Sequence, residues 1–586
     1  MNTATKVTGS NSAAKAWLRA LEKTALIARQ RERVFPVLID ELAAQFGDAT
    51  ALLSESEQLS YQDLSGRSNQ YARWALEHRI AKGDVVCLMM PNRPEFLVVW
   101  LGVTKVGGVV ALLNTNLTGQ ALAHCVRVVE PRHIIADSAF GETIAAAVPD
   151  FWPNRIHTAG AASYSTQELS SSERRPVSIE DRALYIYTSG TTGLPKAAKV
   201  SHARVMQWGG WFQGMLDLEA SDRLYNCLPM YHSVGGVLAP GAILAAGGSL
   251  VIAEKFSASR FWSDVVRWDC TLIQYIGELC RYLVNTSASE FDTLHRVRMA
   301  CGNGLRPDVW EKFQSRFRIP RIFEFYAATE GGLSLFNVEG KCGAIGRVPG
   351  YLAHRYAPTL VRFDHETGAP ARDGNGFCVR CGVDEAGEAI VRMTDDSSNP
   401  GGRFEGYTNQ EASEKRIVRD VFSPGDSWVR TGDLMRRDEA GYFYFVDRIG
   451  DTFRWKGENV ATLEVEEAIC TFPGVEQANV YGVEIAGADG RAAMAALVVR
   501  ENFDIAAFGD HLVSCLPSYA RPLFLRIQSE IETTGTFKQT KNGLARQGFN
   551  PSDTPDVLYF NQADQSAYVR LDRSLFDRIQ AGEVRI

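Results

Sequence analysis

Length, composition and charge limit what this chain can be. Its 586 residues are too many for one hydrophobic core, and 45% hydrophobic with 22% charged residues is typical of a folded globular protein. The net charge of −7, without a long run of Lys or Arg, argues against nucleic acid as the main partner. The 11 scattered cysteines favour reduced thiols over a disulfide framework.

The first 34 residues are set apart from the rest of the chain. Residues 1–12 are small and polar, and we expect them to be disordered. Residues 13–33 mix apolar side chains such as Trp17 and Leu18 with Lys and Arg, which predicts a short amphipathic helix. Such a helix either packs on its own domain or makes peripheral contact with a membrane. Without a recognisable signal peptide, we expect a cytoplasmic protein, with contact at the inner face of a membrane as the alternative.

Between residues 84 and 325, short β-type runs alternate with helical patterns, which predicts parallel sheets covered by helices. Residues 234–253 are nearly all apolar, but five glycines and a proline favour a buried helix, a turn and a strand over a membrane span. The predicted strands are 85–89, 109–113, 133–136, 183–187, 250–253, 271–275, 297–301 and 321–325, with helices at 94–105 and 307–317 among others.

Residues 187–196 read Tyr-Thr-Ser-Gly-Thr-Thr-Gly-Leu-Pro-Lys and directly follow a predicted strand. A loop of backbone N–H groups and small hydroxyls, ending in a lysine, can surround the oxyanions of a polyphosphate. It differs from the Walker P-loop, because only two residues separate Gly190 from Gly193 and Ala197 follows Lys196.

Three further segments carry candidate chemistry. Glu330 follows the strand 321–325, at the strand end where α/β sheets bind ligands, and its carboxylate can hold Mg²⁺ against phosphate oxygens. Asp433, in Thr-Gly-Asp, can accept hydrogen bonds from two ribose hydroxyls. Lys538, in a Thr/Gly turn, can bring a positive charge to a developing phosphate charge.

The chain is predicted to fold as a large α/β N-terminal domain with a β-rich subdomain, plus a small α+β C-terminal lid domain. The β-rich pattern covers about residues 355–446, and a break falls near 447–451. Cys378 and Cys381 form a single CxxC that we interpret as part of a strand and not as half of a zinc site. The expected divisions are 1–34 for the tail and amphipathic helix, 35–448 for the nucleotide-binding domain and 449–586 for the mobile lid.

Together these segments resemble the adenylate-forming superfamily over roughly residues 35–560. Within it, the sequence is most similar to the group of very-long-chain acyl-CoA synthetases and fatty-acid transport proteins. The residues that carry this narrower resemblance are 114–117, 228–232, 274–282, 451–460 and 534–538.

The resemblance implies ligation of a long- or very-long-chain fatty acid to CoA, through an acyl-adenylate, with ATP, Mg²⁺ and CoA as cofactors and co-substrate. It implies catalytic roles for Thr329, Glu330 and Lys538, with Glu330 as the metal ligand. The implied nucleotide-binding residues are Thr188, Ser189, Gly190, Thr191, Thr192, Gly193, Lys196, Gly302, Asn303, Gly304, Tyr326, Asp433 and Arg448. The implied acyl and CoA residues are His232, Tyr275, Gly277 and Gly457.

Several alternatives stay open at the level of sequence. Ala327 stands where most family members have Gly, the hinge is either Gly450 or Asp451, and Lys541 rivals Lys538 because Thr536 and Phe537 separate Lys538 from Thr-Gly. The small residues after His232 predict room for a long alkyl chain. The alternative functions are adenylation with transfer to a carrier protein, and a membrane-associated uptake protein with a regulatory nucleotide site.

Overall fold

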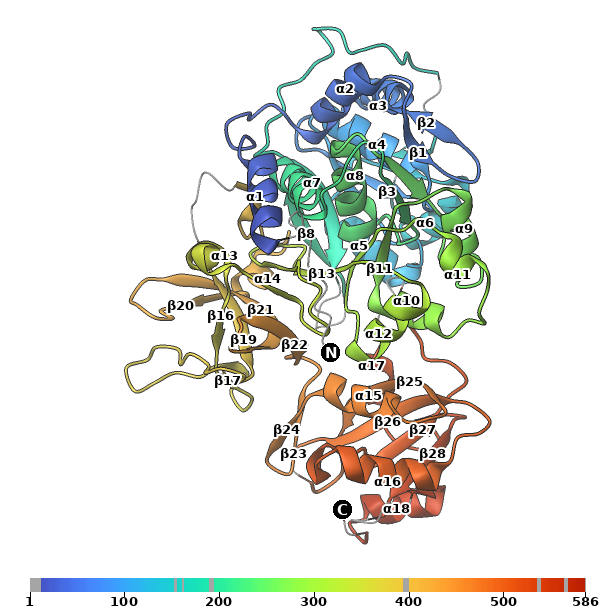
Figure 1. The fold of residues 1–586 in the computed structure, drawn as a ribbon, viewed down its shortest axis with the longest axis vertical. Coiled ribbons are helices and arrows are strands. Elements are labelled where there is room, and N and C mark those ends of the chain that lie inside the picture. Colours follow the sequence, from blue (N-terminus) through green and yellow to red (C-terminus); the bar gives the residue numbers. More distant parts are fainter. Residues whose placement is uncertain are drawn as a thin grey trace, which may run out of the picture.

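The computed structural model describes residues 12–151, 155–160, 163–188, 194–393, 400–488, 490–534, 539–562, 568–584 and 586. Ser189 to Gly193 of the phosphate loop, Lys538 and the N-terminal residues 1–11 therefore lie outside the described residues. Figure 1 shows a large part, built from the residues up to about 448, and a smaller C-terminal part beside it.

The first sheet of the large part carries the predicted phosphate loop. Its strands run parallel except for the last pair, where β8 returns antiparallel to β7, with Thr188 paired to Lys196. In sheet order the strands are β6 (Ile156–Thr158), β5 (His133–Ala136), β3 (Val85–Met89), β4 (Val109–Leu112), β7 (Arg182–Thr188) and β8 (Lys196–Ser201).

The second sheet is also mainly parallel, with antiparallel strands only at its two edges. Its buried β-branched and aromatic residues fit strands covered on both faces. In sheet order the strands are β14 (Ser334–Asn337), β13 (Ile322–Ala327), β12 (Met299–Asn303), β11 (Leu272–Ile276), β9 (Arg223–Asn226), β10 (Ser249–Ile252), β1 (Thr50–Leu53) and β2 (Gln58–Ser60).

Helices cover these two sheets, and most of them are short. The apolar segment near residue 240 is a buried π-helix (Val234–Leu238) continued by α8, followed by β10, as the sequence predicts. Among the described helices, none combines the length and the apolarity needed to cross a bilayer. The helices of this part are α1 (Ala13–Thr24), α2 (Phe35–Phe46), α3 (Tyr61–Glu77), α4 (Pro94–Lys105), α5 (Gly119–Arg127), α6 (Gly141–Ala147), α7 (His202–Leu216), α8 (Ala239–Ala245), α9 (Phe261–Arg267), α10 (Gly277–Val284), α11 (Phe291–Leu294) and α12 (Pro307–Arg316).

The N-terminal helix α1 packs on its own domain, beside α7 (Figure 1). Trp17 is only 1% exposed and lies edge-on to Trp211 and Phe336. Arg19 donates a hydrogen bond to the Gly214 carbonyl at 3.0 Å. The apolar face of this amphipathic helix is therefore part of the core.

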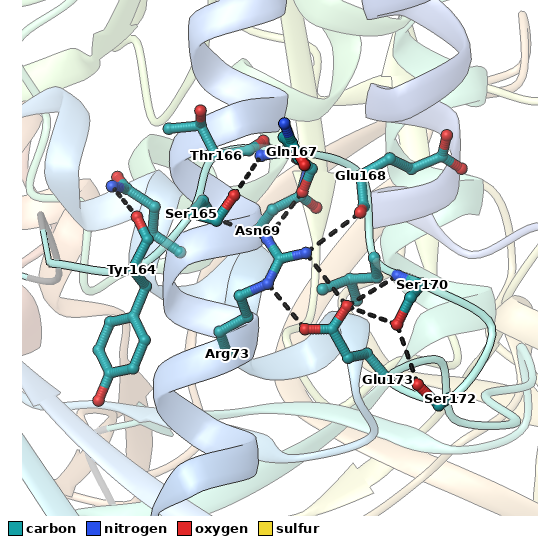
Figure 2. Close-up of polar contacts among 12 residues, drawn as sticks. Asn69, Arg73, Tyr164, Ser165, Thr166, Gln167, Glu168, Ser170, Ser172 and Glu173 are labelled. Carbon is teal, nitrogen blue, oxygen red and sulfur yellow. Dashed lines mark hydrogen bonds and ion pairs between the residues drawn. The ribbon is translucent and has the colours of Figure 1, made fainter.

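A long irregular connection runs from β6 to β7 across α3, and Arg73 holds it there (Figure 2). The Arg73 guanidinium donates to the carbonyls of Ser165 and Gln167, both at 2.7 Å, and its Nε donates to Glu173 at 2.8 Å. These bonds fix the segment that leads into the phosphate-loop strand, whose described residues, 159–160 and 163–181, form no helix or strand.

The β-rich subdomain follows the second sheet and lies at the left of Figure 1. Its main sheet is antiparallel, and β22, which pairs with β15 and β21, leads to the C-terminal part. The strands are β15 (Gly346–Arg347), β22 (Tyr442–Arg448), β21 (Ser427–Arg437), β19 (Gly387–Arg392) and β16 (Thr359–Val361), with β20 (Ile417–Arg419) paired to β21, a hairpin of β17 (Phe363–Asp364) and β18 (Ala369–Pro370), and helices α13 (Ala353–Tyr356) and α14 (Gln410–Glu414).

The C-terminal part has its own hydrophobic core, which begins at Phe453 and includes Phe508, Phe524 and Phe560. Across the junction, Arg281 of α10 donates to the Glu476 carbonyl at 2.8 Å. The elements are β23 (Phe453–Trp455), β24 (Glu458–Val460), α15 (Thr462–Cys470), β25 (Val475–Val483), β26 (Ala492–Val499), α16 (Ile505–Cys515), β27 (Phe524–Ile527), α17 (Asn542–Gln547), β28 (Val557–Asn561), β29 (Tyr568–Arg570) and α18 (Arg573–Gln580).

Candidate functional site

Two described residues, Thr188 and Lys196, flank the phosphate loop. Thr188, the last residue of β7, pairs with Lys196, the first residue of β8. The Lys196 ammonium lies 5.7 Å from the ring centroid of Tyr407, within the range of a cation–π interaction. The backbone of Tyr407 forms an isolated bridge with Ala198, so the segment around it lies along the edge of β8.

Thr329 and Glu330 lie in the turn that follows β13, at the carboxyl end of this strand. The Thr329 hydroxyl is 3.3 Å from that of Ser233, which places the residue after His232 beside it. The buried guanidinium of Arg204 donates to the Thr329 carbonyl at 3.0 Å. The next residue, Gly331, has a φ of +89°, and a Cβ there would collide with Arg204.

Glu330 is buried, and two side chains from the β-rich subdomain hold its carboxylate. The Tyr407 hydroxyl donates to Oε1 at 2.5 Å, and the Arg416 guanidinium lies 3.3 Å from the same oxygen. Arg416 also donates to the Thr431 carbonyl at 2.5 Å. Arg416 thus links the predicted metal ligand to the Thr-Gly-Asp turn.

Asp433 joins two other predicted nucleotide residues. It faces Arg448 across the β21–β22 pairing, with Arg448 Nε 3.6 Å from its carboxylate. The Tyr326 hydroxyl donates to the other carboxylate oxygen. Burial, together with the negative charge of Asp433, raises the pKa of Tyr326 well above its ordinary value, so this phenol stays a neutral donor.

The segment Gly302, Asn303 and Gly304 ends β12 and passes close to other backbone. A Cβ on Gly302 would lie 2.3 Å from the Tyr275 carbonyl oxygen, and one on Gly277 would lie 1.7 Å from that of Gly304. These glycines are needed for the close approach of α10 to this segment. Asn303 Oδ1 is buried and has no hydrogen-bond partner within the described protein, so it is an acceptor that a ligand can satisfy.

Tyr275 of β11 packs against Gly302 of the neighbouring strand β12. Its ring is fully buried and its hydroxyl donates to Glu324 at 2.5 Å, so in this conformation no surface of it is left for an acyl chain. The other Glu324 oxygen accepts from the Leu305 amide at 3.1 Å. Burial raises the pKa of Glu324 to about 8, although the hydrogen bonds from Tyr275, Leu305 and Gly304 oppose this rise.

His232 is half-buried, and its ring centroid lies 4.6 Å from that of Tyr231. The glycines after it do not line an open space. A Cβ on Gly235 would lie 2.6 Å from the Pro229 carbonyl oxygen, and one on Gly236 would lie 1.7 Å from that of Met230. These two glycines therefore do not themselves provide the expected room for an alkyl chain, because they allow the π-helix to pack onto the preceding loop.

The predicted hinge residues and the predicted CoA-site residue lie in different elements at the start of the C-terminal part. Gly450 and Asp451 form a turn after β22, where the Asp451 amide donates to the Arg448 carbonyl at 2.9 Å. Gly457 is exposed at the tip of the β23–β24 hairpin with a φ of +84°. A cavity of about 900 Å³ separates Leu194, at the end of the phosphate loop, from residues that include Arg546 and Phe549. The lid thus turns its 545–549 side toward the phosphate loop.

The Lys541 side chain binds to other residues of the C-terminal part. Its ammonium donates to Thr462 Oγ1 at 2.6 Å and lies 3.0 Å from Glu466. Burial lowers its pKa, but the carboxylates of Glu466, Asp447 and Asp451 outweigh this effect, so that the pKa is raised.

The donor set fits a magnesium ion. The described residues contain no cluster of three or more His, Cys, Asp or Glu that could hold a metal, but Mg²⁺ is commonly bound by one or two carboxylates together with substrate phosphates. Glu330 meets this requirement, because described residues donate to only one of its oxygens and Thr329 is adjacent in the chain.

The structure also adds residues that the sequence analysis did not single out: Tyr407, Arg416, Arg204 and Glu324 all contact predicted site residues. No local sequence pattern distinguishes them. Tyr407 and Arg416, for example, contact site residues that are far from them in the sequence. The site thus combines a glycine- and hydroxyl-rich phosphate loop, a carboxylate suited to magnesium and an acid–tyrosine pair suited to ribose, which defines a nucleotide-binding enzyme.

The chain belongs to the AMP-binding enzyme family: the family profile matches residues 39–376, and the profile of the AMP-binding enzyme C-terminal domain matches residues 464–538. It is 39% identical to long-chain fatty acid transport protein 1 of Mus musculus, over 97% of this chain and 91% of that protein. It is 39% identical to long-chain fatty acid transport protein 6 of Homo sapiens, over 91% of this chain and 88% of that protein.

Solved structures share the fold. ATP-bound MatB from Rhodopseudomonas palustris aligns with a TM-score of 0.73 at 23% identity, over 87% of this chain and 98% of that one. A Mycobacterium tuberculosis fatty acyl CoA synthetase aligns with a TM-score of 0.62 at 22% identity, over 88% of this chain and 98% of that one. The prediction of a large α/β domain with a smaller C-terminal domain is confirmed.

Proposed function

We propose that this protein is an AMP-forming ligase that joins a long- or very-long-chain fatty acid to CoA through an acyl-adenylate. The observation that carries the proposal is the convergence of Lys196 in β8, Glu330 in the turn after β13 and Asp433 in β21, linked by the contacts of Tyr407 and Arg416. Together with membership of the AMP-binding enzyme family, this arrangement supports a site for ATP.

In the first half-reaction, the fatty carboxylate attacks the α-phosphorus of ATP and pyrophosphate leaves. Such a reaction needs placement and charge neutralisation and no protein nucleophile. Lys196 and the Thr329 hydroxyl would bind phosphate oxygens, and Asp433 with Arg448 would bind ribose. Magnesium, held through Glu330, would supply charge neutralisation at the phosphates.

In the second half-reaction, the CoA thiol attacks the acyl carbonyl, AMP leaves and the thiol proton is released. The exposed Gly457 hairpin would have to approach the site for this step, whereas the 545–549 side of the lid faces the phosphate loop here. We infer a rotation of the lid about Gly450 and Asp451 between the two half-reactions.

Lys538 is our choice for the adenylation lysine. The support comes from its rival: the Lys541 ammonium is occupied by Thr462 and Glu466, and moving it to a phosphate would leave Glu466 buried without its partner. In the sequence, Lys538 precedes α17 by four residues, and the described residues 545–549 at the end of that helix line the cavity beside Leu194.

The fatty-acid part of the proposal rests on the relatives, whose names specify long-chain fatty acid transport. Peripheral contact with a membrane is a second part of it. The support is the surface of α1 and the turn after it, where Leu18 and Leu26 are 55% and 51% exposed near exposed Lys23 and Arg29.

The decisive experiment measures pyrophosphate release with carboxylic acids from acetate to very-long-chain fatty acids, with and without CoA, and identifies the acyl product. We expect release that depends on long-chain acids and a CoA thioester as the product. Release without thioester formation would favour transfer to a carrier protein, and ATP binding without acid-dependent release would favour a regulatory nucleotide site.

A further inference from the structure

Tyr407 occupies a central place between groups that the proposed reaction uses. Its side chain is buried, its hydroxyl donates to Glu330 at 2.5 Å, and its ring lies 5.7 Å from the Lys196 ammonium. Its backbone is fixed as well, because the Tyr407 amide donates to the Ser413 hydroxyl at 2.9 Å and the neighbouring Thr408 amide donates to the Ala197 carbonyl at 3.0 Å.

The two oxygens of Glu330 are treated differently. Tyr407 and Arg416 both bond to Oε1, and no described residue donates to Oε2. A carboxylate held through one oxygen cannot rotate freely, so its second oxygen keeps a fixed direction. Carboxylates that ligate metals are usually hydrogen-bonded in this way by neighbouring groups, and loss of such a neighbour weakens metal binding.

We propose that Tyr407 is a positioning residue for the metal-dependent nucleotide site: its hydroxyl fixes Glu330 through Oε1 and so presents Oε2 to a magnesium ion. The inference rests on the proposed function, since it assigns a support residue to the same site. It adds that a residue of the β-rich subdomain orients a carboxylate located in the turn after β13 of the second sheet.

The alternative is that Tyr407 serves only to pack the subdomain against β8. The two roles differ in what the hydroxyl does. Tyr407→Phe keeps the ring, and with it the packing and the Lys196 contact, and removes the hydroxyl, which donates to Glu330 and also interacts with Arg416. A matched control is Tyr444→Phe, because the Tyr444 hydroxyl also donates to a carboxylate, that of Asp438 at 3.0 Å, within the β-rich subdomain.

The test is calorimetric titration of ATP into each protein without fatty acid or CoA, at a series of Mg²⁺ concentrations and in EDTA. For Tyr407→Phe we expect the Mg²⁺ concentration that gives half-maximal enhancement of ATP binding to rise about tenfold, the scale of one lost hydrogen bond to a charged group. ATP affinity in EDTA should match wild type, and Tyr444→Phe should match wild type in both conditions.

The outcomes separate the inference from the proposed function. An unchanged Mg²⁺ requirement in Tyr407→Phe, or an equal loss of ATP affinity with and without Mg²⁺, overturns the positioning role while the proposed function stands. A wild-type protein that binds no ATP overturns both. Thermal midpoints of the two variants, measured in parallel, must match wild type for the expected result to count as positioning.

Discussion

The Lys541 ammonium lies 3.0 Å from the Glu466 carboxylate, and the two side chains are only 16% and 7% exposed. A buried ion pair of this kind is costly to break from one side, because the remaining charge stays buried without a partner. We therefore expect Lys541→Met to lower the free energy of unfolding by roughly 3 kcal/mol, seen as a lower thermal midpoint. Lys541→Met combined with Glu466→Met should recover much of this loss. A single variant as stable as wild type would contradict this role for the pair.

Glu330→Gln tests the predicted metal ligand. The amide keeps the shape of the side chain and an oxygen for Tyr407, but it removes the negative charge that would hold Mg²⁺. We expect a large loss of acid-dependent pyrophosphate release, with fatty-acid binding retained. Full turnover at limiting Mg²⁺ would show that Glu330 is not the ligand. Glu388→Gln is not an adequate control, because Glu388 is itself buried and paired with Arg430.

A pH effect on stability is expected from Glu324, whose pKa burial raises to about 8. Between pH 4.5 and pH 8 the folded protein keeps a proton that the unfolded chain releases, so stability falls as the pH rises through this window. The slope for one such group is at most about 1.4 kcal/mol per pH unit. The thermal midpoint of wild type should therefore fall more between pH 6 and pH 8 than that of Glu324→Gln.

Buried His202 acts in the opposite direction, because burial lowers its pKa to about 4. Its contribution is lost as the pH falls from 6.5 toward 4, and it is the same in wild type and in Glu324→Gln. The difference between wild type and Glu324→Gln therefore isolates the carboxyl group. Parallel profiles for the two proteins would contradict a raised Glu324 pKa.

The exposed face of α1 and the turn after it can be tested against membranes without disturbing the core. Because Trp17 is only 1% exposed, deleting residues 1–33 would remove core packing and confuse the result. We expect Leu18→Ser with Leu26→Ser to weaken binding to anionic liposomes and to leave the thermal midpoint unchanged. Val513→Ser, at a residue 41% exposed on α16, serves as the matched control. Equal liposome binding by all three proteins would make α1 purely structural.

Local patterns predicted the elements better than their assembly. The strands 85–89 and 133–136 and the helix 94–105 match the structure to the residue, because apolar periodicity and flanking turn residues define them locally. The separation into two sheets and the antiparallel return of β8 depend on pairing between distant strands. No pattern within a single segment encodes that pairing.

The same limit applies to the site. Glu330 and Asp433 stand in recognisable motifs, but the bonds from Tyr407 and Arg416 to Glu330 close over 77 and 86 residues. The glycines after His232 show the reverse difficulty, since small residues in a sequence indicate either open space or close packing. Only the positions of the Pro229 and Met230 carbonyls decide between the two.

The last prediction concerns Lys538 and separates the two half-reactions. Negative charge builds around the α-phosphate only while pyrophosphate leaves, so the lysine charge should matter in that step alone. Lys538→Ala should slow adenylation by on the order of 10²–10³, the scale of losing one preorganised electrostatic donor. Conversion of supplied acyl-adenylate and CoA to thioester should survive nearly intact, because a rotated lid would have carried Lys538 away from the site.

Lys541→Ala should instead lower stability through Glu466 and leave the ratio of the two half-reactions close to that of wild type. Selective loss of adenylation in Lys541→Ala, with Lys538→Ala active, would reassign the catalytic lysine. Equal loss of both half-reactions in Lys538→Ala would contradict the rotating lid.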